Sequence, residues 1–251
     1  MTSWEETESP HFTARHDEAD YDDVVGVLEL LEGTRERLSA QFPLMPGMVD
    51  VVLHGTRAQL YAAQPELALV VRLTSPAARR YIVGWPTADG MHLLAPRHVE
   101  TRASSVPGSR EMALLAPAAL YAQLVVGKNN AQLPPPFRAG SLRQMLRWSW
   151  LWAGAGQYFG GQTVHARPAI ARRLREGSEP SFPPTVKDAQ LLGGSVLDLL
   201  AQERGEQAVV DLACRLPAGK PEEALQQAFA QGLVGVGGNW RAHLARIAGQ
   251  Q

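Results

Sequence analysis

The residue pattern of this chain changes near Pro107-Gly108, and this change limits the possible folds more than any other feature. Before it, β-type segments occur at residues 49–53, 67–73 and 81–83, and a hairpin turn is predicted at 88–90. After it, apolar residues recur at helical spacing up to the end of the chain. The sequence therefore predicts an α+β fold: a small twisted N-terminal sheet with helices, followed by a mainly helical C-terminal part.

Three regions follow from this division. Residues 1–10 are acidic and polar and are expected to be a disordered tail, 11–105 an α/β N-terminal subdomain, and 106–251 a helical subdomain. Within the N-terminal part, Asp22 or Asp23 is a suitable N-cap for a helix. The apolar positions of that helix recur at helical spacing: Val24, Val27, Leu28, Leu31 and Leu38.

Charge and composition limit the kinds of binding partner and the cellular compartment that we expect for this chain. The 251 residues are 45% hydrophobic, which is enough to bury a sizeable core, and the formal net charge is −1. No basic stripe favours nucleic acid or anionic lipid, and the basic cluster at 167–175 is expected to be a solvated helix face. The sequence shows no secretory signal and no apolar membrane span, so we expect a cytoplasmic protein. Its arginine-rich, lysine-poor composition suggests a bacterium with a GC-rich genome.

Residues 147–161 read RWSWLWAGAGQYFGG. This segment resembles the second metal-site helix of the gluzincin-type zinc metallopeptidases of the peptidase MA superfamily. In that helix a Trp-Leu pair leads into Glu-Gly, a small residue and an aromatic residue. The glutamate is a zinc ligand, and Ala153 occupies its position here. The residues that match the pattern are Trp150, Leu151, Gly154, Gly156 and Tyr158.

The first metal-site motif of that family, HExxH, is absent. Its spacing places two histidines on one helix face and a glutamate general base between them. The segment that resembles this helix is 110–126, REMALLAPAALYAQLVV, which puts Pro117 and Tyr121 at the histidine positions and Ala118 at the general base. The resemblance therefore implies a degenerate site formed by Pro117, Ala118, Tyr121 and Ala153, with no catalytic residue, no metal ligand and no cofactor.

The resemblance extends in order along the chain. It includes residues 11–16 and 21–42 as the opening strand and helix, 49–60 as a strand entering a helical turn, 81–97 as a hairpin, and 189–247 as closing helices. It implies a thermolysin-like catalytic-domain architecture. Since proline removes a backbone hydrogen bond inside a helix, the first site helix should kink at Pro117 or begin near it. Residues 133–138 (LPPPFR) are expected to be a stiff spacer between the two site helices.

Other reactive side chains offer weaker alternatives. Cys214 is the single cysteine, so no intramolecular disulfide is possible, and its surroundings predict a buried helix face. The seven histidines are scattered and predict no relocated metal site. Neither Ser149 nor Ser195 lies in a nucleophile-elbow motif, and the glycines before Ser195 are expected to allow close helix packing.

Three hypotheses for function remain. The first is a catalytically inactive metallopeptidase-like protein that binds a peptide or protein in the former cleft, which Tyr121, Trp150 and Tyr158 would line. The second is a purely structural or assembly protein in which side chains fill that cleft. The third is a hydrolase that uses residues other than metal ligands, such as Ser149 or Ser195 with a histidine. The sequence favours the first hypothesis, and it leaves the oligomeric state and any partner unidentified.

Overall fold

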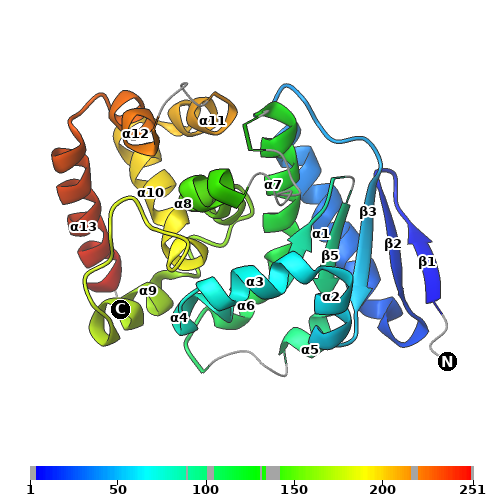
Figure 1. Ribbon diagram of the computed structural model, residues 1–251. Helices are drawn as coiled ribbons and strands as arrows, with labels where there is room; N and C mark the ends of the chain where they lie inside the picture. Colours follow the sequence, from blue (N-terminus) through cyan, green and yellow to red (C-terminus); the bar gives the residue numbers. More distant parts are fainter. Residues whose placement is uncertain are drawn as a thin grey trace.

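The computed structural model describes residues 4–88, 90–100, 105–130, 132–133, 142–215 and 220–249. It arranges them as a sheet with flanking helices followed by a mainly helical half (Figure 1), so the α+β class is confirmed. The N-terminal half contains β1 (Trp4–Glu8), β2 (Phe12–Asp17), the 3-10 turn η1 (Glu18–Asp20), α1 (Tyr21–Ser39), β3 (Val49–His54), α2 (Arg57–Ala63), α3 (Pro65–Leu73), α4 (Pro76–Arg79), β4 (Gly84–Pro86), β5 (Gly90–Leu94) and α5 (Pro96–Glu100). The second half contains α6 (Ser109–Leu114), α7 (Ala116–Asn129), α8 (Leu142–Phe159), α9 (Arg167–Glu176), α10 (Ala189–Arg204), α11 (Glu206–Cys214), α12 (Pro221–Phe229) and α13 (Leu233–Gly249).

The sheet has the strand order β1-β2-β3-β5-β4. The three central strands, β2, β3 and β5, are parallel, and the two edge strands pair antiparallel to their neighbours. Alternate residues of the central strands, such as Phe12, Val51 and Leu53, are buried. This alternation is the pattern of strands that bury one face. The covering helices are α1 and α7, which lie together on one side of the sheet (Figure 1).

A single large hydrophobic cluster connects the two halves of the chain. It includes Phe12 and Leu31 from the sheet and α1, Tyr121 from α7, Trp150 from α8 and Leu200 from α10. All five side chains are buried. The expected subdomains 11–105 and 106–251 are therefore parts of one continuous core.

Two expectations are wrong. Residues 4–8 of the expected disordered tail form β1, which pairs with β2 and carries an ion pair between Glu6 and Arg15 at 2.9 Å. Backbone hydrogen bonds to a neighbouring strand hold this polar segment, although it buries little surface. Residues 67–73, expected as a strand, belong to the helix α3, because Pro65 occupies the first turn of that helix.

Other predictions of elements are confirmed. The helix over Val24 to Leu38, the strand at 49–54 and the hairpin around residue 90 are all present, although the first hairpin strand begins at Gly84. The expected N-cap is wrong, because α1 begins at Tyr21 with Asp20 as its N-cap, and Asp22 and Asp23 lie in its first turn. The turn residue Asp89 and the polyproline segment at 134–138 lie outside the described residues.

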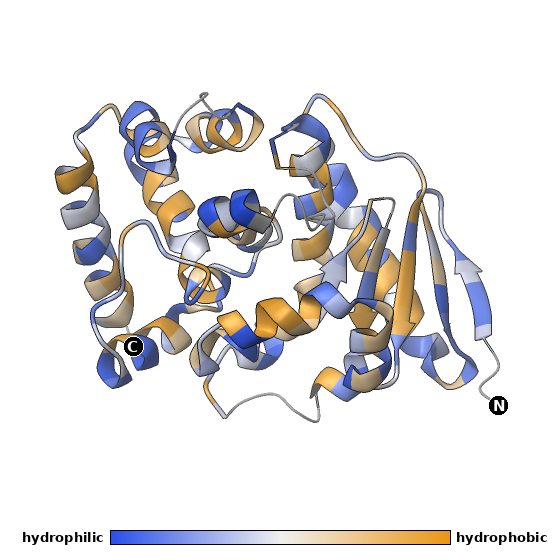
Figure 2. Ribbon diagram, viewed as in Figure 1, coloured by the Kyte–Doolittle hydropathy of each residue, from blue (hydrophilic) through white to orange (hydrophobic). Residues whose placement is uncertain are grey.

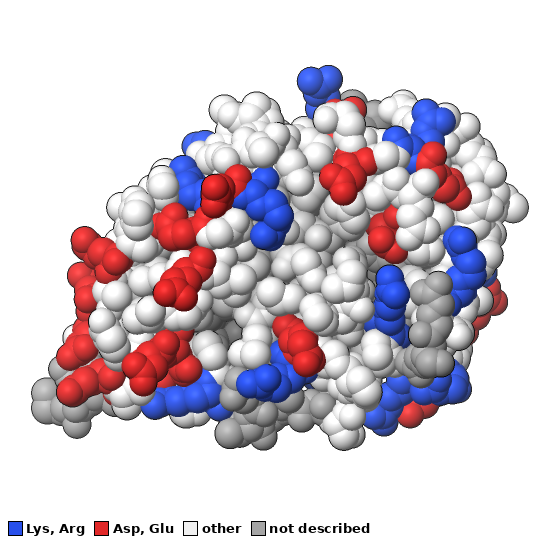
Figure 3. All heavy atoms as spheres, turned by 180° about the vertical axis from the view of Figure 1, so that it is seen from behind, with Lys and Arg blue, Asp and Glu red and all other residues white. Residues whose placement is uncertain are grey.

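The surface differs between the two ends of the molecule. Acidic side chains gather at the N-terminal end, on the left of Figure 3. The exposed acidic residues of this part of the sequence include Glu5, Glu6, Glu8, Glu18, Asp22 and Glu29. In Figure 2, α3 stands out as a largely hydrophobic helix at the surface, where Leu69 is 45% and Leu73 41% exposed. In the described residues, no helix is long and apolar enough to cross a membrane.

Candidate functional site: the two helices that resemble a metal site

Helix α7 starts next to Pro117. Its first residue is Ala116, and Pro117 lies in the first turn. Backbone N–H groups in the first turn make no hydrogen bond within the helix, so the missing N–H of proline costs nothing there. The expectation that the helix begins near Pro117 is therefore confirmed. From Ala116 to Val126 every side chain of α7 is buried, so this helix runs through the interior.

Helix α8 is held between α7 and α10 by glycines. A Cβ atom built on Gly154 would lie 2.6 Å from the carbonyl oxygen of Gly193 in α10. On the other side, a Cβ on Gly160, the residue directly after α8, would lie 2.6 Å from the backbone nitrogen of Ala119 in α7. Real side chains do not fit at such distances, so backbone meets backbone at both contacts. The interpretation of the α10 glycines as packing residues is confirmed.

Ala153, at the expected glutamate position, lies in a second hydrophobic cluster. The same cluster includes Trp152 from α8, Trp85 from β4, and Leu67 and Val70 from α3. Ala153 itself is 2% exposed. The position at which the metal ligand was expected is thus inside an apolar cluster.

The face of α7 that lies opposite Ala153 consists of residues spaced three and four apart. Ala116, Ala119, Leu120 and Gln123 line, together with Ala153, a cavity of about 30 Å³. This spacing places the four α7 residues on one side of the helix. Of these four, only Gln123 has a polar side chain, and its Oε1 is buried without a hydrogen-bond partner within the described residues.

Tyr121 points to a different side of α7. Its hydroxyl accepts a hydrogen bond from Arg35 Nη1 of α1 at 2.9 Å, and its ring packs edge-to-face on Phe12 of β2 at 5.1 Å. The side chain is fully buried, and this burial raises the pKa of the phenol. The structure therefore does not place Tyr121 together with Ala153. Pro117 and Ala118 are also buried, and neither is among the residues that line the cavity at Ala153.

Helical geometry explains the difference in register. Residues 117 and 121 share a face, as do 119 and 123, but the two faces point in different directions because each residue turns the helix by about 100°. The face turned to Ala153 includes the pairs Ala116/Leu120 and Ala119/Gln123. Sequence reasoning missed this face, since an apolar segment without histidine carries no signal that selects one register over another.

The aromatic residues expected to line a cleft are mostly in the core. Trp150 is 1% exposed and belongs to the large cluster, whereas Trp152 is 3% exposed and belongs to the second one. The two tryptophans thus belong to different clusters, and both are in the interior. Tyr158 is half-buried and packs against the large cluster.

The hydroxyl groups of the two candidate serine nucleophiles form hydrogen bonds within the protein. Ser195 Oγ donates to the carbonyl oxygen of Leu192 at 2.7 Å and accepts from Trp240 Nε1 at 2.9 Å. Ser149 Oγ donates to the carbonyl oxygen of Leu146 at 3.1 Å. Burial raises the pKa of the Cys214 thiol, which favours the protonated, unreactive form. Each hydroxyl is thus part of helix packing.

Two histidines that are far apart in the sequence lie together in the structure. His54 of β3 and His92 of β5 lie on neighbouring parallel strands, with Nε2 of the first 2.9 Å from Nδ1 of the second. Their rings are stacked. Burial and the neighbouring His92 lower the pKa of His54 to about 4. Among the described residues, no group of three or more His, Cys, Asp or Glu is arranged to hold a metal ion.

Comparisons with known proteins found no similarity: no protein-family model matches the chain, and no curated protein or solved structure matches it significantly. The arguments about function therefore rest on the sequence and on the geometry described above.

Proposed function

We propose that this chain is a catalytically inactive, metallopeptidase-like protein with a structural or assembly role, in which its own side chains fill the former active-site cleft. The observation that carries the proposal is the position of Ala153, which lies in a hydrophobic cluster opposite Ala116 and Ala119. Neither an alanine nor the nearby glutamine amide supplies the histidine nitrogen or carboxylate that a zinc peptidase needs. The thermolysin-like architecture belongs to the same proposal.

Burial favours a filled cleft over a peptide-binding one. An extended peptide needs an accessible groove or strand edge, but Tyr121 and Trp150 are buried, and the cavity at Ala153 has a volume of only about 30 Å³. Ligand pockets for small molecules are usually about 300 Å³ or larger. A peptide or protein partner would therefore contact another surface. The third hypothesis, a hydrolase, has less support because Ser149 and Ser195 both donate to carbonyl oxygens of their own helices.

The substitution Ala153→Glu tests the proposal. It returns the carboxylate of the family pattern to its position, but within an apolar cluster that offers no histidine. We expect clear destabilisation, since a buried, unpaired carboxylate is unfavourable, and no rise in melting temperature when zinc is added. Ala62→Glu, at an exposed position of α2, is the matched control and should melt close to wild type.

Peptidase activity is measured in parallel. Wild type and Ala153→Glu are incubated with zinc and a library of quenched fluorescent peptides, and a known zinc peptidase serves as positive control. We expect no cleavage by either protein. Zinc-dependent cleavage by wild type, or stabilisation of Ala153→Glu by zinc, would overturn the proposal.

A further inference from the structure

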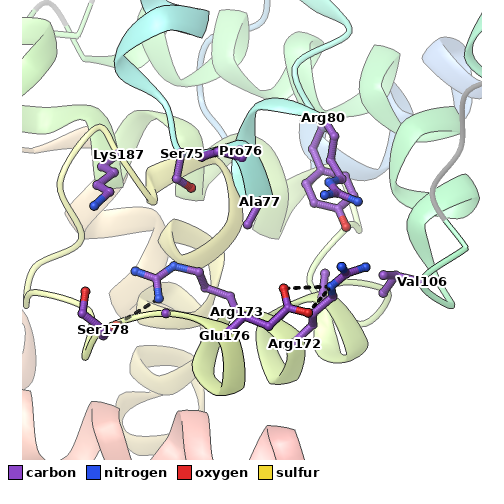
Figure 4. A pocket seen from close by; sticks show the side chains of 13 residues that line it. Ser75, Pro76, Ala77, Arg80, Val106, Arg172, Arg173, Glu176, Ser178 and Lys187 are labelled. Atoms are coloured by element: carbon purple, nitrogen blue, oxygen red, sulfur yellow. Dashed lines mark hydrogen bonds and ion pairs between the residues drawn. The ribbon is translucent and has the colours of Figure 1, made fainter.

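The largest of the three cavities described in the protein lies away from the degenerate site, between α4 and α9. Its volume is about 270 Å³, against about 20 and 30 Å³ for the other two. One wall is the segment from Ser75 to Tyr81, and the other is α9 with the residues that follow it, as Figure 4 shows. A cavity of this size approaches those that hold small organic molecules.

The lining is rich in positive charge. Arg80, Arg172, Arg173 and Lys187 line the cavity, and among the described residues of its lining Glu176 is the only carboxylate. Lys187 lies toward one end and Arg80 toward the other (Figure 4). Cationic walls that converge on a partly enclosed space raise the local concentration of anions.

The floor of the cavity is held rigidly. Arg173 is 7% exposed, and its Nε and Nη2 donate to the two carboxylate oxygens of Asp188 at 3.0 and 2.7 Å. Ser75 Oγ also donates to Asp188, at 3.1 Å, and the backbone N–H of Ser75 donates to the carbonyl oxygen of Lys187. These bonds connect α4, α9 and the start of α10. The walls are therefore positioned before any ligand arrives, which lowers the entropic cost of binding.

Two cations of the lining, Lys187 and Arg172, are positioned to reach a ligand. Among the described residues, no carboxylate pairs with Lys187, and its ammonium points toward the opposite wall, where Ser178 lies (Figure 4). Arg172 pairs with Glu176 at 2.8 Å, but both side chains are substantially exposed. Such a surface pair contributes little stability, so Arg172 is able to exchange its partner for a ligand.

Between the charged ends the walls are apolar. Pro76, Ala77, Val106 and Ala169 line this part, and Ala77 projects into it in Figure 4. We propose that this cavity binds a small organic anion, with its carboxylate or phosphate at Lys187 and an apolar body against Ala77 and Ala169. The proposal is independent of the one about the degenerate site, since the two sites share no lining residue other than Tyr81.

The test is isothermal titration calorimetry at low ionic strength with benzoate, phenyl phosphate and, for comparison, inorganic phosphate. We expect one saturable site for benzoate or phenyl phosphate, and the tighter of the two identifies the preferred head group. Inorganic phosphate should bind more weakly because it does not use the apolar walls. Lys187→Ala should weaken binding about tenfold, the loss of one charge-assisted hydrogen bond.

Two further variants separate this site from general charge effects. Arg246→Ala removes an exposed cation on α13 and should leave the affinity unchanged. Ala77→Phe keeps every charge but fills the cavity, so it should abolish binding, and its melting temperature verifies that it is folded. The absence of saturable binding to wild type would overturn the proposal. Equal affinities of wild type and Lys187→Ala would also overturn it.

Discussion

Substitution of Tyr121 measures how tightly the core between α7, α1 and the sheet is packed. The side chain is fully buried, contacts Phe12 and accepts a hydrogen bond from Arg35. Tyr121→Ala removes a complete aromatic ring from a packed core and should lower the free energy of unfolding by about 3–5 kcal/mol. Tyr121→Phe removes only the hydroxyl. Arg35 Nη1 also donates to the carbonyl oxygen of Pro46 at 2.7 Å, so it keeps one hydrogen-bond partner in this variant. The free energy of unfolding should therefore fall by about 1.5 kcal/mol, the lower end of the range for hydrogen bonds to charged groups.

The assay is urea unfolding followed by tryptophan fluorescence, with the midpoint and slope compared among variants. Tyr21→Ala is the matched control, because Tyr21 is 52% exposed, and it should change stability by less than about 0.5 kcal/mol. If Tyr121 lined an open groove, truncation to alanine would also have a small effect. A loss below about 1 kcal/mol for Tyr121→Ala would therefore refute the assignment of this residue to the core.

Three other predictions concern the buried ion pair, the buried histidine and the helix contact. Arg173→Met should lower the free energy of unfolding in urea by about 3–5 kcal/mol, because it leaves the buried carboxylate of Asp188 without its ion-pair partner. Adding Asp188→Leu should recover most of this loss. A double variant as unstable as Arg173→Met would contradict the prediction. Stability should fall as the pH drops from about 6.5 to about 4, because the folded state lowers the pKa of His54 to about 4 and the unfolded chain protonates first. His54→Asn should weaken this pH dependence when unfolding is measured at several pH values. Gly193→Ala should lower the free energy of unfolding by at least about 1–3 kcal/mol, because the added methyl group overpacks the contact between α8 and α10. Gly238→Ala, at a helical site with free space, should stabilise the protein slightly in the same assay. Equal effects of the two substitutions would argue against the close contact.

Much of the fold was predictable because local signals and tertiary structure agree. The alternation at 49–53 and the helical spacing of Val24 to Leu38 each matched the buried face that formed. Pro117 marked the start of α7 for a purely local reason, its missing N–H. These signals depend on the residue itself or on its immediate neighbours in the sequence.

The failures have non-local causes. The strand β1 was missed because its acidic sequence gives no burial signal, and pairing with β2 holds it in place. Helix α3 was predicted as a strand because its valines favour β structure, but Pro65 and packing against the second cluster select a helix. The face of α7 turned to Ala153, and the contact between His54 and His92, depend on how distant segments pack. The cavity between α4 and α9 likewise joins segments about a hundred residues apart.

Zinc content tests the central claim most directly. Untagged protein is incubated with excess zinc, passed through a desalting column and measured by elemental analysis. The account predicts far less than one zinc per chain, because Ala153 and the α7 residues opposite it supply neither an imidazole nor a carboxylate. One tightly held zinc per chain would contradict the account, and the ligands would then have to be sought elsewhere, beginning with His54 and His92.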